Sequence, residues 1–235
     1  MMRAAPLPIT VLFGLSLALN IWCAGMPEWN WLAAAFIGWY VADFLTGITH
    51  LYMDYRTCTP GVGLDKLFHY SGSRESDEYR SIRSHVLRQI SPFERVVYDF
   101  KNHHPRPDAL GRRSVGVQIG STIIFVSLPW SILLNALCVA LPVPGWLVAG
   151  SIVVMIGGTL AQYFHGTLHR ADNPWIVRAM RRLRLLMTPE AHALHHATLR
   201  RDFATNSGWS NPIVNAVFRL GLSRGWINEQ GLVPR

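Results

Sequence analysis

Long apolar stretches alternate with polar, charged segments along this chain. Four apolar stretches lie at residues 7–26, 29–53, 115–141 and 145–164. Each is close to the ~20 residues that an α-helix needs to cross ~30 Å of hydrocarbon. The second stretch carries Asp43 and the third is interrupted by Pro129, so neither is uniformly apolar. The pattern predicts two helical hairpins in a membrane, each followed by a polar segment, at 56–113 and at 170–235.

The composition agrees with this pattern. Hydrophobic residues make up 50% of the 235 positions and charged residues only 15%, which is apolar for a soluble domain. We therefore predict an all-α integral membrane protein with four transmembrane helices, and we treat residues 1–235 as a single domain. The first stretch is longer than the core of a signal peptide and no small-residue cleavage site follows it. We expect it to be retained as the first helix.

The positions of the positive charges predict the orientation in the membrane. Of the 22 Lys and Arg residues, only Arg3 precedes Arg56, and none lies between Ser114 and His169. The short turns at 25–28 and 142–145 carry none. Because positive charge collects on the cytoplasmic side, both polar segments and both termini are predicted to be cytoplasmic.

The net charge of +8 raises the alternative of nucleic acid binding. The strongest basic patch is the arginine-rich stretch 178–184, which falls within a predicted amphipathic helix at about 175–186. Such a helix lies in the plane of the membrane interface, where arginines attract anionic lipid headgroups. No recognised nucleic-acid motif accompanies the charge, so we predict no nucleic acid partner.

Eight of the ten histidines fall into four tight groups, near the ends of the apolar stretches or in the polar segments. They read His50-x-x-x-Asp54, His103-His104, His165-x-x-x-His169 and His192-x-x-His195-His196. Neutral imidazole is the commonest protein ligand for a transition metal, and one metal takes about four to six donors. Eight histidines and an aspartate therefore predict two metal ions. All four groups fall on the predicted cytoplasmic side, which the charge argument did not assume.

Spacing indicates which of these residues can share an ion. Residues four apart lie on one face of a helix, one turn apart. His165 and His169 can therefore bind a single ion where the fourth stretch leaves the membrane. His50 and Asp54 repeat this geometry at the end of the second stretch.

The other two groups contain adjacent histidines. The group that begins at His192 contains an i,i+3 and an i,i+4 pair, so two of its three histidines face together. His195 and His196 diverge enough to reach different ions. His103 and His104 cannot share a helix face. We expect them either to bridge two ions or to serve one of them from a loop.

Further polar residues could support such a site. Asp43 lies two turns before His50 inside an apolar stretch, where an ionisable residue is a functional hypothesis. It could accept a hydrogen bond from a ligand imidazole or make a structural contact between helices. Asn206 could contribute a ligand amide or order a bound water. His69 and His85 lack grouped partners and are expected to be solvated.

The donor set indicates which metal is bound. The histidine groups contain no thiolate, and the chain lacks the His-Glu-x-x-His signature of zinc peptidases. Imidazoles with one carboxylate suit iron, whose open coordination positions suit O₂ activation. Two irons at the membrane face would suit oxidation of an unactivated C–H bond in a lipid chain. A slot between helices could shield that reaction from water.

With these residues laid out, the chain resembles the Kua/CarF family of plasmanylethanolamine desaturases, also called the lipid desaturase domain family. The resemblance covers residues 31–218 approximately. It rests on the stretches Asp43 to His50 with Asp54, Phe100 to His104, Phe164 to His169, His192 to His196, and Ser207 to Pro212. The combination is specific in order and spacing.

The resemblance implies a four-helix membrane desaturase with a histidine-rich di-iron site. Members introduce the vinyl ether double bond of plasmalogens, and a plastid relative makes a trans double bond near the carboxyl end of an acyl chain on phosphatidylglycerol. Carried over by position, the metal ligands and catalytic residues are His50, Asp54, His103, His104, His165, His169, His192, His195 and His196. The segment 57–99 looks longer and more polar than the family pattern, so it could alter headgroup choice.

The expected partners follow from this chemistry. They are a membrane phospholipid, O₂ and a separate electron donor resembling cytochrome b5 or a ferredoxin, because the sequence shows no haem-binding or ferredoxin-like segment. An acyl-chain desaturase and a lipid hydroxylase stay open as alternatives, since ligand residues do not distinguish them. A metal-handling membrane protein is the alternative outside enzymes. A transporter places ionisable ligands near the bilayer midplane, where this chain has only Asp43.

Overall fold

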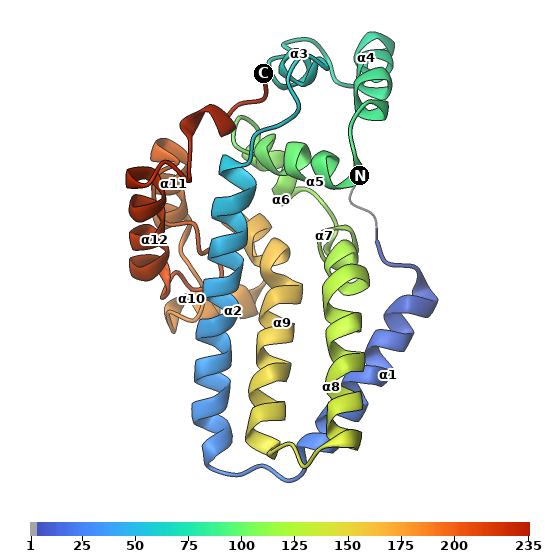
Figure 1. Ribbon diagram of the computed structural model, residues 1–235, viewed down its shortest axis with the longest axis vertical. Helices are drawn as coiled ribbons and strands as arrows, with labels where there is room; N and C mark the ends of the chain where they lie inside the picture. Colours follow the sequence, from blue (N-terminus) through green and yellow to red (C-terminus); the bar gives the residue numbers. More distant parts are fainter. Residues whose placement is uncertain (1–3) are drawn as a thin grey trace.

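The computed structural model describes residues 4–235, and every regular element in this range is a helix (Figure 1). Long helices stand side by side, and the shorter ones lie at one end of them and along the side of α2. The long elements are α1 (Leu7–Ala24), α2 (Asn30–Tyr55), α7 (Val115–Thr122) with the π-helical turn η1 (Ile123–Ser127) and α8 (Leu128–Ala140), and α9 (Gly145–Leu168). They make four helices long and apolar enough to cross a membrane. The four predicted stretches are confirmed as helices of this length and apolar character, with small differences at their ends.

Two of these differences matter for the site. The second span continues to Tyr55, and the fourth continues to Leu168 rather than 164. Asp54 and His165 are therefore part of regular helix, and their directions are fixed by helical geometry.

The third span changes its hydrogen-bond pattern at one turn but stays helical from Val115 to Ala140. Pro129 lies just after the π-helical turn η1, within the first turn of α8. A proline inside a helix lacks an N–H and its ring clashes with the carbonyl four residues earlier. A single π-turn in front of it accommodates the missing bond, so α7, η1 and α8 form one span.

Helices α2 and α9 pack closely side by side, with α2 at the edge of the four long helices (Figure 1). Small residues allow their backbones to approach closely. A Cβ placed on Gly157 would lie 2.6 Å from Cβ of Ala42, and one on Gly38 would lie 2.6 Å from the carbonyl oxygen of Gly150. Such contacts are typical of helix pairs in membranes. They hold the two helices that carry His50 and His165 in a fixed relative position.

The cap is formed by the two polar segments. Its helices are α3 (Leu64–Phe68), α4 (Asp77–Arg88), α5 (Pro92–Lys101), α6 (Pro107–Gly111), α10 (Trp175–Arg182), α11 (Pro189–Thr198), α12 (Asn211–Ser223) and the short 3-10 helix η2 (Glu229–Gly231). The predicted amphipathic helix at 175–186 is shorter than expected. It ends at Arg182 because the chain turns at Arg184, whose φ is +56°.

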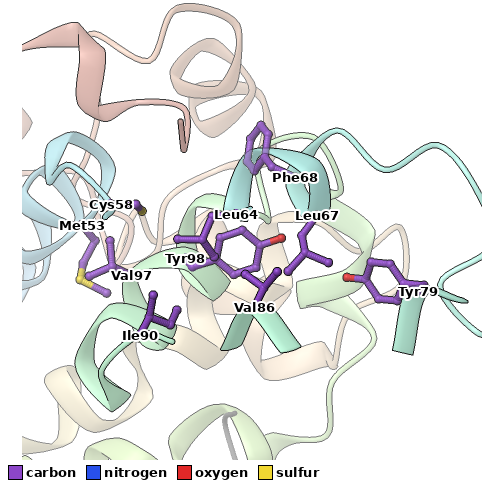
Figure 2. Packing of buried hydrophobic residues seen from close by; sticks show 10 residues of the cluster. All are labelled: Met53, Cys58, Leu64, Leu67, Phe68, Tyr79, Val86, Ile90, Val97 and Tyr98. Carbon is purple, nitrogen blue, oxygen red and sulfur yellow. The ribbon is translucent and has the colours of Figure 1, made fainter. Parts of the chain in front are cut away.

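The segment 57–99 is not a loop but a helical subassembly with its own core. Leu64, Leu67 and Val97 are fully buried, and Val86 from α4 packs among them (Figure 2). The core continues to Met53 at the end of α2. The segment is therefore fixed against the span that carries His50 and Asp54.

The turns that join α1 to α2 and α8 to α9 lie at one end of the bundle (Figure 1). The first polar segment lies at the opposite end, and the second begins there but runs along the side of α2, where Trp39 donates to the carbonyl of Leu185 and Trp209 stacks on Phe36. That both segments begin at the end opposite the turns agrees with the sidedness expected from the charges. That the capped end faces the cytoplasm remains a prediction.

Candidate metal centre

All nine residues predicted as ligands come together at the capped end of α2 and α9. They form two groups, and within each group one ligand atom per residue lies within 4.8 Å of all the others. The five-histidine group consists of His103, His165, His169, His192 and His196. The aspartate group consists of His50, Asp54, His104 and His195. The rings of His50 and His165 are 5.1 Å apart, so the two groups are neighbours.

The long helices contribute pairs in the way that their spacing predicts. His50 and Asp54 face together from the last turns of α2 and belong to the same group. His165 lies in the last turn of α9 and His169 caps its end, and both belong to the other group. The i,i+4 spacing therefore identified which of these residues share a site.

Adjacent histidines are divided between the groups. In α11, His192 and His196 join the five-histidine group while His195 points to the aspartate group. His103 and His104 lie in the turn after α5, and they are divided in the same way. Each adjacent pair therefore links the two groups.

The five-histidine group converges on one point. His192 Nε2 lies 3.0 Å from His165 Nε2, 3.2 Å from His169 Nε2 and 3.1 Å from His196 Nε2. One imidazole nitrogen offers either a single proton or a single lone pair, so it cannot bond to three neighbours. Two nitrogens ~2.1 Å from one ion and about 90° apart are separated by ~3.0 Å. The four nitrogens have the spacing of donors around a common ion.

The aspartate group is arranged around one buried carboxylate. Asp54 is fully buried, and its Oδ2 lies 3.3 Å from His50 Nε2 and 3.4 Å from His195 Nε2. Its Oδ1 lies 3.3 Å from His104 Nε2. Among the described residues, none of these oxygen and nitrogen atoms has a hydrogen-bond partner. Buried polar atoms without partners are costly, so this donor set fits a cation that would complete it.

Backbone carbonyls orient two of the rings. His195 Nδ1 lies 2.8 Å from the carbonyl oxygen of Arg201, and His103 Nδ1 contacts the carbonyl oxygen of Phe100. When each Nδ1–H donates to its carbonyl, the lone pair of Nε2 points to the centre. This is the usual arrangement of metal-binding histidines.

Burial keeps the imidazoles of the cap neutral. It lowers the pKa of His104 and His169 to about 4 and that of His196 to about 3. It also holds the pKa of His103 and His192 well below the ordinary value, and neighbouring imidazoles add to the effect. At neutral pH these rings are uncharged, the form that binds a metal.

Asp43 has a different role from the one expected of a ligand's partner. Its Oδ1 accepts hydrogen bonds from the backbone N–H groups of Ser207 (2.7 Å) and Gly208 (3.0 Å). Its Oδ2 accepts from the N–H (2.9 Å) and hydroxyl (2.7 Å) of Ser210. Of the two roles considered for Asp43, these four hydrogen bonds favour the structural one over a bond from a ligand imidazole. The contact joins α2 to an irregular segment rather than to another helix, and the carboxylate anchors that segment to the middle of α2.

Asn206 belongs to the same segment. Its Nδ2 donates to the carbonyl oxygen of Gly157, 3.1 Å away on α9. Gly157 precedes His165 by eight residues, ~12 Å along the helix axis. This position argues against a ligand amide, and Asn206 instead connects the segment to α9. Irregular backbone at membrane depth is tolerated only where protein surrounds it, and residues 203–206 are all buried.

Several residues around the centre were not found by sequence reasoning. Lys101 is fully buried, and its ammonium group donates to the backbone carbonyl of Asp54. Burial lowers the pKa of Lys101 to about 8. Its place two residues before His103, as a charge beside an apolar run, was the only available signal. His69 and His85 are exposed, as expected, although His85 lies in α4 rather than in a loop.

A cavity leads from the centre into the bundle. This slot, of about 410 Å³, lies between α2, η1, α8 and α9. It is lined mainly by Leu45, Val126, Trp130, Val154, Met155 and Ala161, and it reaches His50, Phe100 and His165. His50 belongs to the aspartate group and His165 to the five-histidine group, so the slot opens onto both.

The spans and the histidine cluster together define a membrane protein with a candidate metal centre. The family model described as the lipid desaturase domain matches residues 76–221. The chain therefore belongs to the lipid desaturase domain family, and it is an oxidoreductase of membrane lipids. It is similar to the plasmanylethanolamine desaturase of Myxococcus xanthus, with 25% identity over 241 residues that cover 100% of this chain and 74% of that protein. No solved structure matches the chain.

Proposed function

We propose that this protein is an O₂-dependent phospholipid desaturase with two irons, which forms the vinyl ether double bond of a plasmalogen. The observation that carries the proposal is the apolar slot that ends on His50 and His165, one from each histidine group. The name of the Myxococcus xanthus relative supports the choice of a plasmanyl substrate.

The direction of the slot favours reaction close to the headgroup. On α2 and α9, the lining residues all precede His50 and His165, toward the middle of the membrane. From Val154 to His165 the slot follows α9 for ~16 Å. A lipid chain lying in it would place its first carbons beside the histidines and its remainder toward the bilayer centre. The first two carbons of an ether-linked chain are those that form the vinyl ether.

The walls of the slot are mostly apolar, and the exception is Gln162, whose buried Oε1 has no hydrogen-bond partner among the described residues. The hydroxyl of Thr49 donates to the carbonyl of Leu45 (2.8 Å), and that of Thr46 donates to the carbonyl of Asp43 (2.9 Å). These threonines therefore satisfy their polar atoms within α2. An apolar slot excludes water from the reacting carbons, which limits side reactions.

The overall reaction removes two hydrogens from neighbouring carbons and reduces O₂ to two waters. Two of the four electrons come from the substrate, and two come from a separate donor together with two protons. The irons, when bound, supply the activation of O₂. His50, Asp54 and the other seven residues hold them, and Phe100, whose ring meets His50 edge-on at 4.9 Å, closes the slot beside the reacting carbons.

The proposal is tested by lipid analysis of a host that supplies ether lipids. The chain and a His165→Ala control are expressed, and lipids are compared by mass spectrometry before and after acid treatment. Acid-labile species two hydrogens lighter, absent from the control, are expected. A product that has lost two hydrogens but is stable to acid would contradict the proposal and indicate an acyl-chain desaturase. A product that has gained one oxygen would indicate a lipid hydroxylase. Metal uptake without lipid change would favour a metal-handling protein.

A further inference from the structure

A second cavity, of about 700 Å³, opens beside the centre where α6, α7 and α9 meet. Three arginines, Arg112, Arg113 and Arg170, lie in its wall. We propose that this arginine pocket binds the phosphate group of the phospholipid substrate. The inference rests on the proposed function and adds the residues that recognise the headgroup.

The arginine pocket lies at the level where two spans leave the membrane. Arg112 and Arg113 directly precede Ser114, the N-cap of α7, and Arg170 follows the end of α9 at Leu168. Lipid phosphates occupy this level, and arginines there attract them. Many such arginines only anchor a helix, so position alone does not define a site.

The connection to the centre sets this pocket apart. Its wall includes His169, a member of the five-histidine group. His169 follows His165 by one helical turn, ~6 Å, and His165 lines the slot. The slot and the arginine pocket therefore approach the same group from two sides. A phospholipid could place its phosphate in the arginine pocket and its chain in the slot. Its glycerol would then lie across the histidine groups.

The side chain of Arg170 is held in place by contacts within the protein. Its Nε donates to the carbonyl of Gly111, its Nη2 donates to the carbonyl of Arg113 (3.2 Å), and its guanidinium lies 5.8 Å from the ring centre of Tyr163. These contacts fix the orientation of a side chain that would otherwise be flexible. A fixed guanidinium loses less entropy when it binds phosphate.

The charges in the pocket leave a net attraction for an anion. Against the three arginines stand two carboxylates, Asp108 and Asp172. Asp108 Oδ2 lies 4.0 Å from Arg112 Nη1, so Arg112 is only loosely paired. The first turn of α7 opens into the same cavity and adds the positive end of a helix dipole.

A third cavity provides a contrast. It is lined by Arg181, Arg184 and Arg201, but by no member of either histidine group. Both cavities therefore contain several arginines, but of the two only the arginine pocket includes a residue of the histidine groups. Arg184→Gln is therefore the matched control.

The test compares two substrates in vesicles: a plasmanyl phospholipid and the same ether glycerolipid without its phosphate. In the iron-loaded double variant Arg112→Gln/Arg170→Gln, we expect the lipid fraction giving half-maximal rate to rise about tenfold or more for the phospholipid. The maximal rate should change less than twofold, and the phosphate-free lipid should be unaffected. Arg184→Gln should behave as wild type, and Arg170→Lys should recover part of the preference.

Binding without turnover separates this inference from the proposed function. Retention of each lipid by detergent-solubilised protein is measured by native mass spectrometry. Wild type should prefer the phospholipid and the double variant should not, even if no desaturation is found. An unchanged preference would overturn the inference, as would inorganic phosphate binding as tightly as the lipid. If the double variant keeps the lipid preference but its rate no longer depends on the electron donor, the pocket would instead be a docking site for that donor.

Discussion

Two buried polar clusters inside the helical bundle differ in how their polar atoms are satisfied. The first, which we call the polar zipper, joins α1 to α8 through Ser16, Asn20, Ser131 and Asn135. Ser16 Oγ lies 2.7 Å from Ser131 Oγ, Ser131 donates to Asn20 (2.6 Å), and Asn135 donates to the carbonyl of Ser16 (3.0 Å). None of its buried side-chain atoms lacks a partner.

The histidine cluster joins α2, α9 and the cap in the opposite way. Both oxygens of Asp54 and the Nε2 atoms of His50, His103, His104 and His195 are buried without a hydrogen-bond partner among the described residues. Burying a polar atom without a hydrogen bond in an apolar surrounding lowers the stability of the fold by roughly several kcal/mol. A cluster that is satisfied internally is explained by packing, whereas one whose donors converge and are unpaired fits the proposed metal ions. The predictions below test this distinction.

The largest effect is expected from removal of a ligand. His165→Ala or His196→Ala should reduce desaturation below about one hundredth of wild type and lower the bound iron, because each imidazole lies within the five-histidine group. Iron analysis and lipid mass spectrometry on the same preparations provide the measurement. His69→Ala, at an exposed position, should retain most of both, and an equal loss in all three variants would refute the grouping.

Removal of iron should destabilise the whole protein. The donors of the histidine cluster repel one another and lack partners without a cation, so chelation should lower the melting temperature by several degrees, by linkage. Thermal unfolding in detergent, with and without a chelator and after iron is added back, measures this. A melting temperature that does not change with iron would contradict the interpretation of the unpaired donor atoms as metal ligands.

Filling the slot should reduce activity while the metal is kept. A Cβ at Gly158 has open space around it, and this residue lines the slot. Gly158→Leu should therefore lower the rate on long-chain substrates about tenfold, with iron content and melting temperature close to wild type. Gly14→Leu is the control, because Gly14 in α1 also has open space but lies outside the slot. Equal rates for both variants would exclude the slot as the chain-binding site.

Loss of the Asp43 carboxylate should mainly affect stability. Asp43→Asn removes a charged acceptor of four hydrogen bonds from residues 207–210. We expect a cost of about 1–3 kcal/mol, and a smaller fall in iron content than in the ligand variants. The free energy of unfolding and the iron content are measured together. Iron loss as complete as in His165→Ala, at unchanged stability, would restore a direct role for Asp43 at the metal centre.

The smallest effect on function is expected in the polar zipper. Interhelical hydrogen bonds in membranes contribute about 0.6 kcal/mol on average, and the zipper lies between α1 and α8, away from the ligands. Asn20→Leu should lower stability by about 1–2 kcal/mol, since partners at Ser131 and Asn135 are left unpaired. Activity per folded molecule and iron content should match wild type. A loss of iron in this variant would contradict the contrast between the two clusters.

Local periodicity explains why part of this structure was predictable. Apolar length predicts the helices long enough to span, and helical spacing predicts the pairing of His50 with Asp54 and of His165 with His169. The separation of His195 from His196 also follows, because adjacent residues point in different directions. These properties depend on a single helix each.

Features that depend on packing between distant segments were not predictable. Asp43 lies at a spacing that suggested contact with a histidine, but residues 207–210 occupy its carboxylate instead. The division of His103 and His104 depends on the turn after α5, and the slot is lined by residues from separate helices, among them Val126 of η1 and Val154 of α9. No local pattern reveals which segment fills the space beside a helix.

The most direct test is the iron content of the purified wild-type protein beside two single-group variants, His165→Ala and Asp54→Asn. Each histidine group has the donors for one ion, so wild type should hold two irons per chain. Each variant should lose iron first from its own group, with a change in the Mössbauer signal of the coupled pair. One iron per chain in wild type, or iron content unchanged by both substitutions, would contradict a two-metal centre built from these residues.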